Sequence, residues 1–455
     1  MRQPKHDQGT IIEPARRVPV VHECDICVVG GSATGVFAAV RAARLGARVA
    51  IVERQNCFGG VATAAMVNIW HSLHDTIGEQ QIIAGLTEEV IERLVKRDAV
   101  LKTGQLVNAF RMNTEELKIE LDELVVEHGI TAFLHTLYCA PVLEDGRLKA
   151  IVVENKNGRQ AIVARQFIDA SGDGNLAMDL ELEAYDPGTL QPPTTCAKIQ
   201  GLNSLGSWDW QGAVIEHGHE FGLREDWGWG GSIPGLDDIQ MRADTHVFDT
   251  NTAEADSLTA SEIEGRRQVR AIMDVIRKYG PADSRIGLVD LAATIGARET
   301  RRIAAGYRMT GEDVLYGHRF DDAIAYGSYR VDIHHAAGAG ITFRYLDGSE
   351  VEIPSRGATA ITRRWRQPQD VDPTYYQIPF RSLVQDRIPN LTLAGRMLDA
   401  DKTAFSAVRV MVNMNQTGEA AGTAAYLALD SGEAIWQIDP AAVRRTLAAG
   451  GSVML

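Results

Sequence analysis

The feature that most constrains the fold is a turn of small residues near the N-terminus, Gly30-Gly31-Ser32-Ala33-Thr34-Gly35. A β-branched run precedes it, and an Ala-rich stretch and a second apolar run follow, so residues 25–54 are predicted to form a strand, a helix and a parallel strand. Such a βαβ unit binds the pyrophosphate of a dinucleotide. Gly30 permits the tight turn, the small Ser32 lets the backbone approach the phosphates, and Gly35 lets the helix pack closely on the strand. Free N–H groups and a positive dipole at the helix N-terminus favour the anion.

The residues after this unit favour FAD over NAD. Glu53 ends the second strand, at the spacing where an acidic side chain accepts a hydrogen bond from a ribose hydroxyl. Residues 54–63 then form a small-residue loop that runs into a predicted helix, whereas a nicotinamide-binding domain would continue with its next strand. We therefore expect FAD to be held by Gly30, Ser32, Ala33, Thr34, Gly35, Glu53, Arg54, Gly59, Gly60 and Thr63.

The rest of the chain divides by pattern. Residues 75–128 are predicted to be largely helical, and residues 131–169 read as short strands joined by turns, a β-meander. The stretch 184–388 carries no second dinucleotide fingerprint. We expect an α/β fold with a Rossmann-like FAD-binding domain and β-meander, built from residues 1–183 and 389–455, and an inserted α+β substrate domain, residues 184–388.

In their order along the chain, these segments resemble the FAD-dependent oxidoreductases with a glutathione-reductase-like flavin domain, in the branch related to fumarate reductase flavoproteins. The resemblance rests on residues 25–54, 57–63, 168–174, 296–302, 376–383 and 390–422. It implies that the loop with Gly172 and Asp173 returns the meander to the flavin. The chain departs from the family pattern at Ser32, where the fingerprint usually has glycine.

The resemblance also assigns roles to the C-terminal segment. It implies that Gly395 and Arg396 form a turn beneath the pyrophosphate, and that Val410 and Met411 pass beside the isoalloxazine ring. Residues 417–422 resemble the closing helix of the family, whose small residues pack on the first βαβ unit.

Catalysis at a flavin needs a proton-transfer group and a positive group for any carboxylate or developing oxyanion. His334 ends a strand-like run, two residues after a possible orienting carboxylate at Asp332, and is the leading proton-transfer candidate. Arg298 lies in a cationic run, and the resemblance places Arg409 beside the ring; either is a candidate for holding a substrate carboxylate. His71, with His74 after it, is a further choice.

These residues predict a dehydrogenase that transfers a hydride between a small organic substrate and flavin N5. Two alternatives stay open: a fumarate-reductase-like reductase of an activated alkene, and a flavin-binding assembly protein without catalysis. The electron acceptor and the state of assembly, including a homo-oligomer, are also left open.

Charge and composition narrow the partners. The formal net charge of −14 argues against nucleic acid and anionic membranes, and no uncharged apolar run approaches the roughly 20 residues that span a bilayer, so we expect a cytoplasmic protein. We expect no metal site. Cys24 and Cys27 lie three apart on a predicted strand, so their sulfurs should point to opposite faces. His217 and His219 have no further ligand at a suitable spacing.

Overall fold

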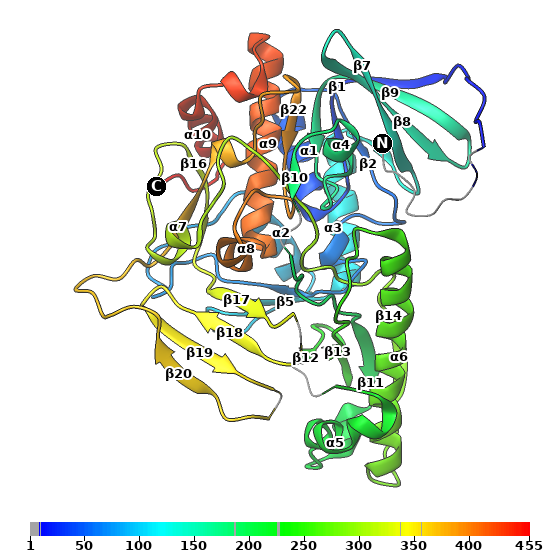
Figure 1. Cartoon of the computed structure of the whole chain (residues 1–455), viewed down its shortest axis with the longest axis vertical. Coiled ribbons are helices and arrows are strands. Elements are labelled where there is room, and N and C mark those ends of the chain that lie inside the picture. Colours follow the sequence, from blue (N-terminus) through cyan, green and yellow to red (C-terminus); the bar gives the residue numbers. More distant parts are fainter. Residues whose placement is uncertain (1–8, 10, 186–187, 225–227, 337, 356) are drawn as a thin grey trace.

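The computed structural model describes residues 9, 11–185, 188–224, 228–336, 338–355 and 357–455. Its main sheet has the strand order β6-β2-β1-β9-β8-β7, with β22 beside β9 (Figure 1). These strands span Val20–Val29 (β1), Val49–Val52 (β2), Thr131–Phe133 (β6), Leu137–Glu144 (β7), Arg147–Asn155 (β8), Gly158–Asp169 (β9) and Leu391–Leu393 (β22). The fold is therefore mixed α/β with a parallel core, as the sequence predicted.

Strand β9 joins the meander to the parallel part of the sheet. One of its edges pairs in parallel with β1. The other edge pairs antiparallel with β8 over the first half of β9 and in parallel with β22 over the last residues. The N-terminal, middle and C-terminal segments thus share one sheet, and β1, β2, β9 and β22 all end at the same edge. In open α/β sheets, ligands bind outside this carboxyl edge.

Helices α1 (Ala33–Arg44) and α9 (Met411–Ser431) pack against each other beside this sheet (Figure 1). A Cβ atom at Gly418 would overlap the carbonyl oxygen of Thr34, and one at Gly422 would overlap that of Ala38. The two helices approach this closely because α9 has no side chain at these positions. The expectation that small residues of this helix pack on the first βαβ unit is confirmed.

The remaining helices of the described residues surround this core and the inserted stretch. They are α2 (Leu86–Val95), α3 (Thr114–Glu127), α4 (Asn175–Asp179), α5 (Trp210–His217), α6 (Ala255–Tyr279), α7 (Gly311–Leu315), α8 (Lys402–Val408) and α10 (Pro440–Ala449). The expectation that residues 75–128 are largely helical was partly wrong. Two strands, β4 (Val100–Lys102) and β5 (Phe110–Met112), separate α2 from α3. β5 pairs with β4 and with β3 (Ile69–Trp70), a long-range contact that local periodicity does not reveal.

The stretch 184–388 adds antiparallel sheets below the main sheet in the view of Figure 1. One has the order β12-β13-β11-β14 and packs near the long helix α6; another has the order β17-β18-β19-β20. Their strands are Ala197–Gln200 (β11), Trp229–Ser232 (β12), Ile239–Ala243 (β13), Gly287–Leu291 (β14), Val331–His334 (β17), Ile341–Arg344 (β18), Ser349–Ile353 (β19) and Ile361–Arg364 (β20). Two short pairs complete the set: β10 (Ala184–Tyr185) with β15 (Arg302–Ile303), and β16 (Ala323–Gly327) with β21 (Tyr376–Pro379).

The cysteine pair departs from the sequence expectation. Cys24 and Cys27 lie in the same buried apolar cluster, and the neighbouring Cys24 thiol, together with burial, raises the pKa of Cys27 well above its ordinary value. The amides of Asp25 and Ile26 both donate to the carbonyl of Arg48, at 2.9 and 3.2 Å, so the strand is irregular between the two cysteines. Regular alternation of side chains therefore fails here, and the expectation of opposite faces was wrong. Both thiols are buried and free, and no cluster suited to a metal occurs among the described residues.

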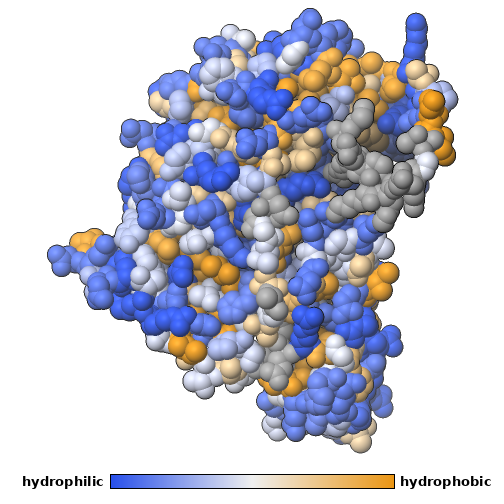
Figure 2. Space-filling model, in the orientation of Figure 1, coloured by the Kyte–Doolittle hydropathy of each residue, from blue (hydrophilic) through white to orange (hydrophobic). Residues whose placement is uncertain are grey.

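The face of the molecule in Figure 2 is mostly hydrophilic, with apolar residues in small groups between polar ones. In the described part of the chain, every helix is too short or too polar to cross a bilayer.

Candidate functional site

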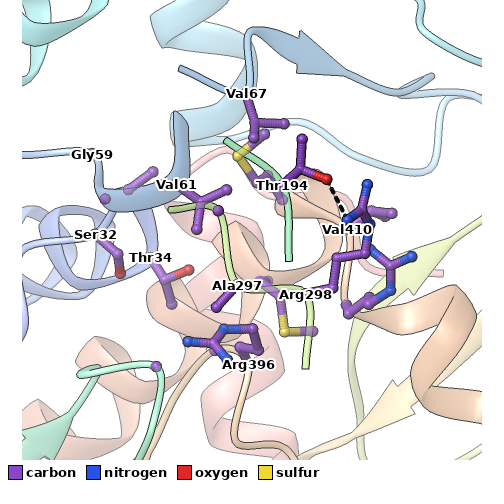
Figure 3. Close-up of a pocket in the computed structure, with 18 of the residues that line it drawn as sticks. Ser32, Thr34, Gly59, Val61, Val67, Thr194, Ala297, Arg298, Arg396 and Val410 are labelled. Atoms are coloured by element: carbon purple, nitrogen blue, oxygen red, sulfur yellow. Dashed lines mark hydrogen bonds between the residues drawn. The ribbon is translucent and has the colours of Figure 1, made fainter. Parts of the chain in front are cut away.

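A cavity of 390 Å³ opens at the carboxyl edge of the main sheet. Residues that follow β1, β2, β9 and β22 line it, together with residues from the inserted stretch (Figure 3). All the predicted catalytic residues contribute: His71, Arg298, His334 and Arg409. Every predicted cofactor residue also lines it except Gly35 and Thr63. The two predicted sets, chosen from segments far apart in the sequence, thus meet in one cavity.

The glycine-rich turn has the geometry that its residues predict. Gly30 has a φ of +104°, and a Cβ there would lie 2.5 Å from the carbonyl oxygen of Ala170. A Cβ at Gly35 would overlap the carbonyl oxygen of Gly30, so this residue shapes the turn without lining the cavity. Ser32, which replaces the usual glycine, is the N-cap of α1 and accepts a hydrogen bond from the Gly35 amide at 3.3 Å. The departure at Ser32 therefore stabilises the start of the helix.

Glu53 braces this turn from the end of β2. Its carboxylate accepts hydrogen bonds from the amides of Gly31 and Gln55, both at 2.7 Å. The side chain is buried yet lines the cavity. Thr63 acts in the next loop, where its hydroxyl donates to the carbonyl of Phe58 at 2.5 Å. Each contact fixes a backbone segment beside the cavity.

Asp173 and Arg396 form an ion pair across the cavity wall, with Asp173 Oδ1 2.7 Å from Arg396 Nη2. Thr300 donates to the same carboxylate oxygen at 2.9 Å and accepts from Arg396 at 2.8 Å. Burial alone would raise the pKa of Asp173, but Arg396 and Thr300 outweigh it and hold this pKa below its usual value. The loop after β9 and the turn after β22 are thereby locked together.

The residues present fit FAD. The N-termini of α1 and α9 both lie at the cavity, through Ser32 and Ala33 on one side and Val410 and Met411 on the other. The first N–H groups of a helix have no intrahelical partner and carry partial positive charge. One such terminus suits a pyrophosphate, and the other suits the negative charge that a flavin ring gains on reduction. In addition, the buried amide of Asn415 lines the cavity and has no hydrogen-bond partner among the described residues.

Strand β17, from the inserted stretch, presents Asp332 and His334 to the same cavity. His334 Nε2 lies 3.5 Å from Asp332 Oδ1. The phenol of Tyr329 donates to Asp332 Oδ2 at 2.6 Å, and Arg409 Nη2 lies 3.6 Å from the same oxygen. Burial holds the pKa of His334 well below its ordinary value, and the nearby charges of Arg298 and Arg409 lower it further. His334 is therefore a neutral imidazole at physiological pH.

The two arginine candidates reach this wall from different elements. Arg298 donates to the carbonyl of Pro192 and, at 2.6 Å, to the hydroxyl of Thr194 (Figure 3). Arg409 caps the end of α8 and donates to Gln191 Oε1 at 3.3 Å. The Nε atom of Arg409 is buried and has no hydrogen-bond partner among the described residues. A buried, unsatisfied cationic donor in a cavity is suited to an anionic ligand.

His71 also lines the cavity and stacks on the ring of Tyr329, with centroids 4.0 Å apart. Its Nδ1 accepts a hydrogen bond from the amide of Asn108 at 3.2 Å. Burial, with the charges of Arg330 and Arg409, lowers the pKa of His71 to about 3. His74, the companion choice, does not line the cavity.

Several lining residues were not found from the sequence. Tyr329 and Arg330 belong to the same strand-like run as His334, but nothing in that run distinguished them as cavity residues. Gln191 does not line the cavity, but its Oε1 accepts hydrogen bonds from the His334 amide and from Arg409, and its Pro-rich loop carries no motif that would have revealed this.

Residues 208–229 contain four tryptophans. Trp229 lines the cavity, whereas Trp208 and Trp210 pack on the separate core beside α5 and α6. Trp227 lies outside the described residues.

Three solved structures are among those similar to this chain. A geranylgeranyl bacteriochlorophyll reductase-like protein from Thermoplasma acidophilum is 10% identical to this chain, with a TM-score of 0.46. The match covers 94% of this chain and 83% of that protein's chain. A triple mutant of the flavin-dependent brominase Bmp2 is 10% identical, with 93% and 85% covered and a TM-score of 0.45. A mutant of the halogenase PltM in complex with FAD is 11% identical, with 94% and 74% covered and a TM-score of 0.44.

A sequence search of curated proteins found no match. The family model described as FAD dependent oxidoreductase, in contrast, matches residues 25–447, nearly the whole chain. The chain therefore belongs to the FAD-dependent oxidoreductase family, and FAD is its cofactor.

Proposed function

We propose that this oxidoreductase is a dehydrogenase that takes a hydride from a small organic substrate, with N5 of the bound FAD as the acceptor. The observation that carries this proposal is that His334, Arg298 and Arg409 line the same cavity as the cofactor residues. The residues for holding a substrate, moving its proton and binding the flavin are thus within one site.

His334 is the proposed base. Oxidation of an alcohol or an amine releases a proton as the hydride leaves, and a neutral imidazole can accept that proton. The depressed pKa of His334 keeps it in this form. Asp332, 3.5 Å from Nε2, would stabilise the imidazolium that results.

Arg298 and Arg409 are the proposed anchors for a negatively charged group of the substrate. They approach His334 from different elements, and both positive charges act on its pKa. A carboxylate held between guanidinium groups would fix the reacting carbon relative to His334.

The division of labour follows the proposed domains. Residues 184–388 supply Arg298 and His334, whereas residues 1–183 and 389–455 supply the cofactor residues and Arg409. The inserted stretch would then act as the substrate domain that covers the flavin.

A second candidate is the reverse type of reaction, reduction of an activated alkene, which needs a proton donor. Tyr329 is the candidate donor, because its phenol lines the same cavity and carries a proton at neutral pH. The phenol points at Asp332 within the same cavity wall.

An anaerobic screen tests these proposals. Metabolites that bear an alcohol or amine beside a carboxylate are added to the FAD-loaded protein, and flavin absorbance is followed. Bleaching by one of them supports the dehydrogenase. Reoxidation of the chemically reduced flavin by an activated alkene supports the second candidate. If no tested donor reduces the flavin and no tested acceptor reoxidises it, both proposals are contradicted and a non-catalytic role is favoured.

A further inference from the structure

Asn415 is a buried amide whose hydrogen-bonding capacity is unused. Its exposed fraction is 1%, and neither Oδ1 nor Nδ2 has a hydrogen-bond partner among the described residues. Leaving buried polar atoms unsatisfied is costly, and native structures rarely do so without a ligand or an ordered water. The side chain lines the cofactor cavity. A partner for this amide is therefore to be sought inside the cavity.

Two neighbouring side-chain amides on α9, by contrast, bond to other parts of the protein. Asn413 donates to the hydroxyl of Tyr376 at 2.9 Å and to the carbonyl of Ala407 at 3.3 Å. Gln416 both donates to and accepts from the backbone of Tyr326, at 2.8 and 3.0 Å. Both are buried, and neither lines the cavity. Asn413 and Gln416, which face protein, bond through at least one side-chain atom, although Asn413 Oδ1 has no partner among the described residues. Asn415, which faces the cavity, bonds through neither atom.

The position of Asn415 on its helix limits which part of FAD it can meet. It lies one turn after Met411, the first residue of α9, and both residues line the cavity. Gly418, a further turn away, packs on Thr34 at the start of α1. Asn415 therefore stands between the two helix N-termini that face the cavity, next to the one suited to a reduced flavin ring.

A carboxamide offers a donor and an acceptor side by side. The pyrimidine edge of an isoalloxazine offers the complement, because carbonyl oxygens flank its N3–H group. Ribityl hydroxyls also donate and accept, but they gain no charge when the flavin is reduced. The pyrimidine edge does gain negative charge, and a hydrogen bond donated to a charged acceptor is the stronger one.

We propose that the Asn415 carboxamide hydrogen-bonds the pyrimidine edge of the flavin and binds the reduced ring more tightly than the oxidised ring. This rests on FAD as the cofactor and is independent of the proposed reaction. Asn415 is thus a positioning residue that sets the affinity and the reduction potential of FAD.

The test compares wild type with Asn415→Leu, which keeps the number and branching of the side-chain heavy atoms and removes both polar atoms. FAD should bind about tenfold more weakly, in keeping with the loss of one or two hydrogen bonds. If the reduced form loses about tenfold more affinity than the oxidised form, the two-electron midpoint potential falls by about 30 mV. Dye-linked anaerobic titration measures the potential, and fluorescence of released flavin measures the affinity.

A thermal measurement separates this role from a structural one. Because the amide has no partner in the protein, the FAD-free Asn415→Leu chain should melt at the same temperature as the wild type or higher. Addition of FAD should raise its melting temperature less than that of the wild type. If the FAD-free variant is destabilised and its flavin potential is unchanged, the amide has a structural role and the proposal is wrong.

Two further variants complete the design. Asn415→Asp removes the donor and adds negative charge, so it should lower the potential more than Asn415→Leu. Asn413→Leu is the matched control on the same helix: it should lower thermal stability, since it loses the bonds to Tyr376 and Ala407, and leave the potential unchanged. Weaker FAD binding in both Asn415 variants with an unchanged potential would assign the amide to the ribityl chain and overturn the proposal.

Discussion

Nε2 of His334 lies 3.5 Å from Oδ1 of Asp332, on the strand β17 that faces the flavin cavity. The two residues are two positions apart, so the alternation of a β-strand places both side chains on the same face. Burial and the surrounding arginines keep the imidazole neutral, while the carboxylate is held by Tyr329 and Arg409. A neutral base beside a fixed carboxylate is the arrangement on which the proposed proton transfer depends.

Replacing His334 should separate catalysis from cofactor binding. His334→Gln removes the proposed base, so turnover of a substrate found by the anaerobic screen should fall at least about 100-fold. FAD content, measured by absorbance, should be unchanged. His335→Gln is the control, because that ring bonds Thr342 at 2.9 Å and does not line the cavity. Full activity of His334→Gln would remove this residue from the mechanism.

Replacing Arg409 should weaken the use of an anionic substrate. Arg409→Lys keeps the positive charge and loses the planar guanidinium, so kcat/KM should fall by about tenfold or more. Arg381→Lys serves as the control because Arg381 lies outside the cavity. An uncharged analogue of the substrate should be equally poor for wild type and Arg409→Lys. If Arg409→Lys has the same kcat/KM for the anionic substrate as wild type, the anchoring role of Arg409 is wrong.

His71 should make the protein less stable in acid. Its pKa falls from the usual 6.5 to about 3 on folding, so between these pH values the unfolded chain binds a proton that the folded chain does not. Stability therefore increases with pH over this range and is lost as pH falls below about 6.5. His71→Phe, which can still stack on Tyr329, should lose less stability than wild type between pH 7 and pH 5. Denaturant titrations at several pH values measure this, and parallel pH profiles would contradict it.

A side chain at Gly418 should disrupt the close packing of α9 on α1. Gly418→Ala places a methyl group against the carbonyl of Thr34, so one of the two helices must shift. We expect this shift to lower the free energy of unfolding by about 1–3 kcal/mol or more. Because Thr34 belongs to the turn that lines the cavity, FAD binding should weaken as well. Gly287→Ala is the control, since nothing lies within 4 Å of a Cβ there. Unchanged melting temperature and FAD affinity in Gly418→Ala would show that the helices adjust freely.

Much of the cofactor site could be predicted from the sequence because its determinants are local. The positive φ of Gly30, the hydrogen bond that Ser32 accepts as N-cap, and the contact of Gly35 with Gly30 all lie within one short segment. The meander was recognisable because its turns and alternating strands are also local. The long-range pairing of β3 with β5, by contrast, escaped the helical pattern, and a local irregularity at Asp25 placed two cysteines on one face against the rule of alternation.

By itself the sequence determined that the chain forms a dinucleotide-binding βαβ unit and that its other segments resemble pieces of one FAD site. Only the tertiary structure decided that His71, Arg298, His334 and Arg409 share a cavity with those pieces, and that Asn415 enters it without a partner. The reason is physical. Backbone conformation and helix capping depend on neighbours in the chain, whereas burial, charge and hydrogen-bond satisfaction depend on residues that only folding brings together.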